Sequence, residues 1–313
     1  MIFKNLILVI LCICLSGCFS APIAYITNQG SNTVSVVDIK KKKIRQEISV
    51  GNGPVGIAIS LKQSYAYISN ANDSSVSVLD LQRNEVIKII KLNGTPVGIT
   101  KSSNEDYIFV SDWFNSEIYV IETKSLEVIK KMTVGKSPSG IICDTKGKYL
   151  FISNRDENTV EIYNQSDLNL VNKIKVGKHP YGVFVNKDLL FVVNVLDDSI
   201  SIVNTSSFAS ETIKVGDHPY GVVSDLNNHF AFVTNTQDDN ISVIDLKSKN
   251  EVKKIKVGGN PEGIDINEQN NMLITSNWRS DSISIIDLEK QEYLYDIKTG
   301  KQSRSFGQFI KID

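Results

Sequence analysis

A repeat of 40 to 42 residues runs through this chain and constrains its fold more than any other feature. An Asn or Asp ends a short β-branched segment at seven places: Asn28, Asn70, Asp112, Asn154, Asn194, Asn235 and Asn277. A loop of the form G-x-x-P-x-G recurs in step, with prolines Pro54, Pro96, Pro138, Pro180, Pro219 and Pro261. A period of about 40 to 45 residues with four strand-like segments per unit is typical of a β-propeller. The sequence therefore predicts an all-β, seven-bladed β-propeller of four-stranded antiparallel blades.

The repeats are offset by one strand from the ends of the chain. The first unit begins with Ala24 to Asn28, which matches the second strand of the other repeats. The last segment, Ser305 to Ile310, matches a first strand, although Ser303 and Ser305 replace the proline and glycine of its loop. Three N-terminal strands and one C-terminal strand would complete a shared blade and leave no open sheet edge. We expect one propeller over residues 23–313 and no second domain.

The N-terminus resembles an export signal. Residues 1–17 carry a single charge, Lys4, and an unbroken apolar run from Leu6 to Leu15, which is too short to span a bilayer. The order Leu15-Ser16-Gly17-Cys18 resembles the lipobox of bacterial lipoproteins. This resemblance implies cleavage before Cys18 and a lipid on that cysteine, with residues 18–22 as a short tether. A plain signal peptide, cut for example after Ala21, is the alternative.

Composition narrows the function classes. Removal of residues 1–17 takes Lys4 from the 34 basic residues and leaves 33 against 35 acidic ones. This near balance does not provide the basic surface of a general nucleic-acid binder, so no nucleic-acid partner is expected. Apart from Cys18, Cys143 is the one thiol left after cleavage, which excludes a disulfide framework or a cysteine metal cluster. Cys143 aligns with Ile59 and is predicted to be a core residue.

Structural roles are expected for the repeated residues. The Asn that ends the second strand can bond its own turn backbone, as in an Asx turn. The first glycine of the G-x-x-P-x-G loop is expected to adopt a positive φ, and proline suits a position that needs no ladder donor. The second glycine would let innermost strands approach one another near the axis.

The second-strand segments carry a family resemblance. YITN (25–28), YISN (67–70), FVSD (109–112), FISN (151–154), FVVN (191–194) and FVTN (232–235) are followed by SVID-like segments and VGxxPxG loops. This pattern resembles the YVTN family of propeller repeats over nearly the whole chain after the leader. The resemblance implies a secreted, periplasmic or cell-surface bacterial or archaeal propeller. Such propellers serve as surface-layer modules, binding platforms or partner subunits of redox enzymes, so the fold alone does not select an activity.

Topology predicts which face carries a site. In a four-stranded antiparallel blade, the proline loops and the Asn turns share one face. The tether would reach the propeller from the opposite face, because only residues 19–22 separate Cys18 from the first strand. We therefore expect the proline-loop face to point away from a membrane anchor. Phe19 after the lipidated cysteine is consistent with delivery to an outer membrane, facing the periplasm or the surface; in a single-membrane cell the chain would be exterior.

The proline loops are not uniform, and this is where a binding site is predicted. The candidate ligand- or partner-binding residues are His179, Tyr181, His218, Tyr220, Glu262 and Arg304, with Trp113 and Trp278 after the Asn column. Aromatic walls with a few polar groups are typical of ligand sites, and large aromatics favour protein or glycan contact. The alternative is structural: the tyrosines plug the channel, the histidines bond the loops, Glu262 pairs with Arg304, and the tryptophans pack between blades.

The predicted function is a lipid-anchored, monomeric binding or scaffolding module for a protein, glycan or small ligand, without a cofactor, metal or catalytic residue. Two alternatives stay open. One is a lyase or lactonase-like enzyme that uses His179 or His218 as a base with Glu262. The other is an accessory subunit of a periplasmic redox enzyme. The sequence has no G-x-S-x-G elbow, phosphate loop or CxxCH haem site.

Overall fold

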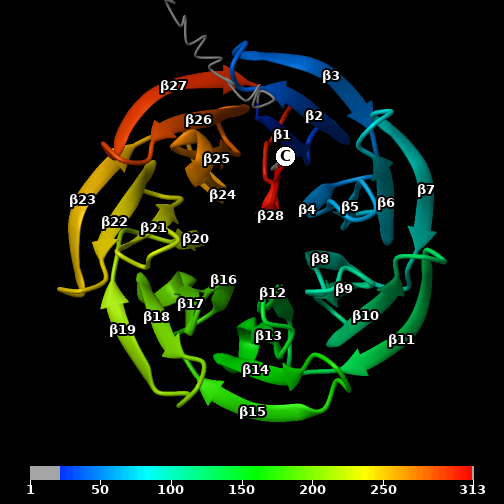
Figure 1. Ribbon diagram of the computed structural model, residues 1–313, viewed down its shortest axis with the longest axis horizontal. Helices are drawn as coiled ribbons and strands as arrows, with labels where there is room; N and C mark the ends of the chain where they lie inside the picture. The colour runs from blue at the N-terminus through cyan, green and yellow to red at the C-terminus, as the bar shows by residue number, and fades with distance from the viewer. Residues whose placement is uncertain (1–21, 312–313) are drawn as a thin grey trace, which may run out of the picture.

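The computed structural model describes residues 22–311; the leader, Cys18 and most of the tether lie outside the described residues. Figure 1 shows a closed ring of blades around a central axis. Seven sheets make up the ring, and six of them have four strands, so the prediction of a seven-bladed, four-stranded antiparallel propeller is confirmed. Among residues 22–311, no helix combines the length and apolar character that a bilayer-spanning segment needs.

Each blade runs from an innermost to an outermost strand. The innermost strands are β4 (Pro54–Ser60), β8 (Pro96–Lys101), β12 (Pro138–Cys143), β16 (Pro180–Asn186), β20 (Pro219–Ser224), β24 (Pro261–Asn267) and β29 (Ile310–Lys311). The second strands are β1 (Ile23–Asn28), β5 (Tyr65–Asn70), β9 (Tyr107–Asp112), β13 (Tyr149–Asn154), β17 (Leu189–Asn194), β21 (Phe230–Asn235) and β25 (Met272–Asn277).

The third strands are β2 (Thr33–Asp38), β6 (Ser75–Asp80), β10 (Glu117–Glu122), β14 (Thr159–Asn164), β18 (Ser199–Asn204), β22 (Asn240–Asp245) and β26 (Ser282–Asp287). The outermost strands are β3 (Lys43–Ser49), β7 (Glu85–Lys91), β11 (Glu127–Thr133), β15 (Leu170–Lys175), β19 (Ser210–Lys214), β23 (Asn250–Lys256) and β27 (Glu292–Lys298). Short 3₁₀ turns are η1 (Arg155–Glu157), η2 (Val195–Asp197) and η3 (Glu268–Asn270), and β28 (Phe306–Gln308) precedes β29.

Burial follows the position of a strand in its blade. The second strands are buried along nearly their whole length, because each blade packs between two others. The outermost strands are largely exposed and rich in lysine, as in β23, whose sequence is NEVKKIK. Lysines on an edge strand hinder pairing with another chain. The hydrophobic core therefore lies between the blades rather than at one centre.

The ring closes as predicted, but the closing strand is divided. Ile310 and Lys311 of β29 pair with Ala24 and Ile23 of β1, which completes a blade from both ends of the described chain. The preceding strand, β28, instead runs parallel to β4 of the next blade. Gly307, the middle residue of β28, has a φ of 118°, which a residue with a Cβ rarely adopts. The sequence had predicted one continuous strand, Ser305 to Ile310. It could not show the division, because the change of partner depends on contacts with another blade.

The glycine after proline has the expected role. A Cβ at Gly98 would lie 2.0 Å from the carbonyl oxygen of Ser139 in the next blade, which is too close for any side chain. The prediction for the first glycine is wrong. None of these first glycines has a positive φ, including Gly94, which is shifted to two residues before the proline in the second loop; a Cβ at Gly94 would instead overlap the carboxylate of Asp112. In most loops the positive φ falls on the residue before proline, as at Gly53 and Ser137.

The Asn column also differs from the expected Asx turn. The Asn70 amide donates to Ser75 and Ser77 on the third strand, at 3.0 and 2.9 Å, and so ties two strands of one blade. The preceding Ser or Thr ties neighbouring blades, a role the sequence did not reveal. The Ser69 hydroxyl donates to the carbonyl of Val97 at 2.7 Å and accepts from the backbone N–H of Gly56.

Candidate functional site

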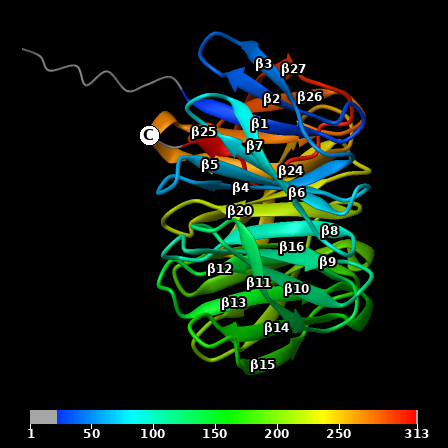
Figure 2. The same ribbon diagram turned by 90° about the vertical axis from the view of Figure 1, so that its right-hand side faces the viewer.

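The two faces of the ring differ in what they expose. We call the face with the loops before the innermost strands the proline-loop face, and the face where residues 22 and 311 lie the terminal face. Figure 2 shows the ring edge-on, with loops along both faces and the C-terminal end of the chain on one of them. Because Ile23 pairs with Lys311, both ends of the described chain meet on the terminal face.

The predicted tyrosines close the channel at the proline-loop face. The Tyr181 ring centroid lies 4.2 Å from that of Tyr220 and 4.9 Å from that of Phe306. Val55 and Val97, from two further blades, complete this apolar cluster. Tyr181 is only 4% exposed. The plug proposed as the structural alternative is therefore present; Tyr181 offers little surface to a ligand, and Tyr220 is half-buried.

Glu262 and Arg304 form an ion pair beside this plug. The Arg304 Nε lies 2.6 Å from the Glu262 carboxylate, and the Arg304 guanidinium also donates to the Tyr220 hydroxyl at 2.8 Å and to Gln29 at 3.2 Å. The indole N–H of Trp278 donates to the same Gln29 oxygen. Burial raises the pKa of Glu262, and the adjacent guanidinium opposes this shift. Four of the predicted residues thus share one polar cluster.

The two histidines occupy strained loop positions. His179 and His218 have φ values of 52° and 51°, in the left-handed region where His is tolerated better than most residues. The backbone N–H of His218 donates to Asp198 of the preceding blade at 3.0 Å, and its Nδ1 lies 2.5 Å from Asp217. Burial lowers the pKa of His179, and nearby Arg155 adds to this.

The structure does not gather both histidines with Glu262. Within residues 22–311, the group of three potential metal ligands whose donor atoms lie within 4.8 Å of one another is Asp198, Asp217 and His218. Both aspartates are exposed, and the bonds just described account for their position. Glu262 belongs to the Arg304 cluster instead, so both histidines and Glu262 do not form one three-residue group.

Trp113 lies on the opposite arc from Trp278. Its ring contacts Tyr181, with centroids 5.9 Å apart, and the Arg155 guanidinium lies 5.3 Å above it. Its neighbour Phe114 is 76% exposed, and Leu196, two blades further on, is 48% exposed. We call Trp113, Phe114, Arg155 and Leu196 the rim patch. Sequence reasoning missed Phe114, although the adjacent aromatics at 113 and 114 were a signal for it.

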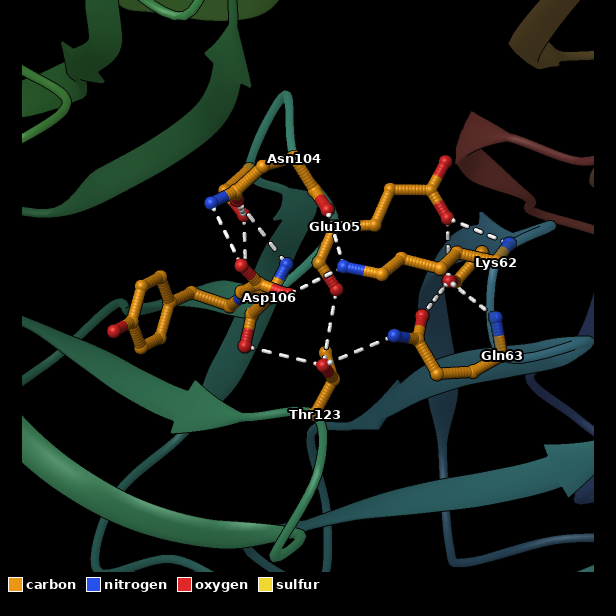
Figure 3. Close-up of polar contacts among 9 residues, drawn as sticks. Lys62, Gln63, Asn104, Glu105, Asp106 and Thr123 are labelled. Atoms are coloured by element: carbon orange, nitrogen blue, oxygen red, sulfur yellow. Dashed lines mark hydrogen bonds and ion pairs between the residues drawn. The ribbon is translucent and has the colours of Figure 1, made fainter.

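A cavity opens at the other end of the channel, on the terminal face. Its volume is about 590 Å³, and six of the innermost strands, all except β29, line it together with β28. On the same face, turns of neighbouring blades bond to one another. In Figure 3, Lys62 reaches Asp106 at 2.5 Å and the carbonyl of Asn104 at 3.1 Å, while Glu105 accepts from the backbone of Lys62. Burial tends to raise the pKa of Glu105, but bonds from Lys101, Ser60 and Lys62 outweigh it and lower that pKa.

Asp265 is a buried carboxylate in the wall of this cavity. Its Oδ2 accepts from the backbone N–H groups of Phe309 and Ile310, both at 2.8 Å, and its Oδ1 accepts from Ile266 at 2.9 Å. It therefore holds the C-terminal strand to the last blade. Other innermost strands have Ala58, Thr100, Ile142, Phe184 and Val223 at this position. Burial raises the pKa of Asp265 to about 7, against the effect of these hydrogen bonds.

This raised pKa predicts a pH dependence of stability. An unfolded Asp has a pKa of about 4, so between pH 4 and 7 the folded protein holds the proton that the unfolded chain has lost. The free energy of unfolding should therefore fall as the pH rises. Between pH 5 and 8, we expect wild type to lose about 2 to 3 kcal/mol relative to Asp265→Asn. Denaturant titrations of both proteins at each pH measure this, and parallel pH profiles would contradict it.

One break in the inter-blade bonding lies next to Tyr220. Six of the seven second strands carry a Ser or Thr hydroxyl before the final Asn or Asp, and β17 carries Val193. In the preceding blade, Ser153 donates to the carbonyl of Tyr181 at 2.8 Å. Val193 cannot donate to the carbonyl of Tyr220 in this way. The Tyr220 loop is instead tied through its hydroxyl to Arg304.

The amino-acid sequence was compared with protein-family models and with curated proteins. A family model described as YNCE-like beta-propeller matches residues 16–146. The PE-PGRS family protein PE_PGRS18 of Mycobacterium tuberculosis (strain ATCC 25618 / H37Rv) is 56% identical over 36 residues, which are 12% of this chain and 8% of that protein. The match thus spans less than a tenth of the curated relative.

Solved structures share the fold at low identity. Kuenenia stuttgartiensis hydrazine synthase superposes with a TM-score of 0.76 at 18% identity, covering 89% of this chain and 99% of that chain. A functionally unknown protein from Desulfotomaculum acetoxidans DSM 771 gives 0.79 at 14%, covering 93% and 98%. Dihydro-heme d1 dehydrogenase NirN, in complex with DHE, gives 0.69 at 13%, covering 89% and 64%. The chain is therefore a β-propeller repeat protein that is similar, over residues 16–146, to YNCE-like beta-propellers.

Proposed function

We propose that this protein is a YVTN-type, lipid-anchored binding or accessory propeller of the cell envelope, which contacts a protein or glycan partner through its proline-loop face. The anchor would be a lipid on Cys18. A tether of residues 19–22 would hold the terminal face toward the membrane and leave the proline-loop face free. The propeller itself would act as a monomer.

The observation that carries this proposal is the rim patch. Aromatic residues and arginine are enriched at protein interfaces, and energetic hot spots concentrate in Trp, Tyr and Arg. Here Phe114 is 76% exposed, beside a tryptophan that carries an arginine above its ring. The plug beneath Trp113 fixes the ring of this residue, so little side-chain entropy is lost on binding. A rigid aromatic surface of this kind is better suited to binding a partner than to catalysing a reaction.

The environment of Glu262 favours binding over catalysis. A general acid or base must reach substrate with a free proton site. The Glu262 carboxylate is 8% exposed and is paired with Arg304, so it has no free position for a substrate proton. For these reasons a lyase or lactonase activity through Glu262 is the weaker proposal.

An accessory role beside a redox enzyme is a second candidate. It is favoured by the likeness in fold to chains from hydrazine synthase and from dihydro-heme d1 dehydrogenase NirN. At 18% and 13% identity these likenesses concern the fold alone. In this case the partner captured by the rim patch would be a haem or copper protein.

Photo-crosslinking in whole cells tests the proposal. A benzoylphenylalanine at position 114 or 196 should capture a discrete partner, whereas the same group at Lys146, on the terminal face, should not. Trp113→Ala should weaken capture from position 196 about tenfold, as expected for a hot-spot aromatic. Ile129→Ala, at an exposed site on β11, is the matched control and should leave capture unchanged. Equal capture from positions 114 and 146 would overturn the binding face.

The lipid anchor is tested in the same cells. Metabolic labelling with an alkyne fatty acid should mark the wild type but not Cys18→Ser, which should leave the membrane fraction. An unlabelled wild type would overturn the anchor while the crosslinking result stands on its own.

A further inference from the structure

The cavity on the terminal face has the size and shape of a small-molecule site. Its volume of about 590 Å³ falls within the range of about 300 to 1,000 Å³ typical of ligand pockets. Phe306, which packs against the tyrosine plug, forms part of its wall. The residues after the prolines, from Val55 to Arg304, do not line it. The plug therefore separates the cavity from the proline-loop face.

The interior of this pocket is apolar and only partly covered by protein. Ile142, Val183, Phe184 and Ile266 all line it, and each is half-buried, although the innermost strands are otherwise largely buried. Apolar side chains that converge on a concave surface gain free energy when a ligand removes them from water, at about 25 cal/mol per Å². The pocket thus favours an apolar occupant.

The charges of the pocket are mainly acidic. Asp144 and Glu268 are among its lining residues, while Asp265, whose pKa burial raises to about 7, contributes less charge. The one basic residue among them, Lys101, is bonded to the Glu105 carboxylate and so is already neutralised. Carboxylates in a concave, low-dielectric site attract cations and repel anions. An anionic ligand such as a fatty acid or a phosphate ester would therefore be disfavoured.

We propose that this pocket binds one mainly apolar small molecule, neutral or cationic at its polar end, which enters through the terminal face. The apolar part lies against Ile142, Val183 and Phe184, and the polar end lies at the mouth near Asp144 and Glu268. This site is distinct from the rim patch. Because the plug separates the pocket from the proline-loop face, the small molecule can bind while a partner covers that face.

Dye displacement tests this proposal on the full chain. Nile red, a neutral apolar dye, should bind and brighten. Decyltrimethylammonium and decanol, below their micelle concentrations, should displace it about tenfold more effectively than decanoate. Ile142→Trp, which fills the pocket, should weaken dye binding about tenfold, while Ile129→Trp, at a site 53% exposed on the outermost strand, should not. Equal dye binding by both variants would overturn the site, and equal displacement by all three compounds would overturn its charge preference.

A second measurement does not depend on a variant that folds. Cys143 lies in the pocket wall and is half-buried. Saturating decyltrimethylammonium should slow its alkylation by a maleimide, followed peptide by peptide by mass spectrometry so that the N-terminal cysteines are scored separately. An unchanged rate at Cys143, with the dye displaced, would place the bound compounds elsewhere and overturn the proposal.

Discussion

Replacing Phe309 by alanine is expected to lower the free energy of unfolding by about 3 to 5 kcal/mol, the usual cost of removing a buried phenylalanine ring. Phe309 is fully buried, although it lies only a few residues from the end of the chain. Its side chain packs in the cluster that joins the blade of β1 to residues of the last blade such as Ile274 and Ile285. Its carbonyl accepts from the backbone N–H of Tyr25, and its own N–H donates to Asp265.

The large effect follows from the position of Phe309 at the closure of the ring. Loss of the phenyl group leaves a cavity and loosens the strand that joins the first blade to the last. Denaturant titration measures the change, and Phe114→Ala is the matched control. Because Phe114 is 76% exposed, its truncation should change the free energy of unfolding by less than about 0.5 kcal/mol. Similar effects of the two substitutions would contradict the role of the C-terminal segment as the ring closure.

Replacing Arg304 by methionine is expected to cost about 3 to 5 kcal/mol, because it leaves the buried Glu262 carboxylate without its cation. The Glu262 and Arg304 side chains are 8% and 18% exposed, so solvent replaces little of the lost interaction. The substitution also removes the hydrogen bonds to Tyr220 and Gln29. Replacing both partners by apolar residues of similar size avoids an unpaired charge. Glu262→Met/Arg304→Met should therefore be more stable than Arg304→Met alone.

An exposed ion pair on the same face provides the control. Arg279 donates to both carboxylate oxygens of Asp239 at 2.7 Å, with side chains 58% and 33% exposed. Surface pairs contribute about 0 to 1 kcal/mol, so Arg279→Met should change the free energy of unfolding little. If Arg304→Met and Arg279→Met cost the same, the pair beside the plug would not be the buried element described here.

Much of the architecture could be predicted from the sequence because it depends on spacing. The Asn column, the proline loops and the β-branched segments recur at an interval that matches one blade, so strand order and ring closure follow. Gly98 and its equivalents were also predictable, since a close approach near the axis that recurs from blade to blade requires a residue without a Cβ. The roles of Gly94 and Asn70 were not, because these residues contact other strands rather than their own turns.

The candidate site could be predicted only in part. The pattern of irregular loops indicated Tyr181, Tyr220, Glu262 and Arg304, and these residues do lie together. Their binding of a partner stays a prediction. Neither Phe114 nor the pocket was predicted from the sequence. The pocket is formed by side chains from many blades, and no local sequence pattern shows that these side chains are half-exposed.

The sequence by itself determined the number of blades, the strand order within each blade and the face on which each loop lies, because these depend on a short-range repeat and on the alternation of antiparallel strands. Only the tertiary structure decided that the channel is plugged at one face and open at the other, and that Asp265 holds the final strand to the last blade. Both features depend on which side chains meet across the axis or between the chain ends, and those contacts join residues separated by one repeat or more.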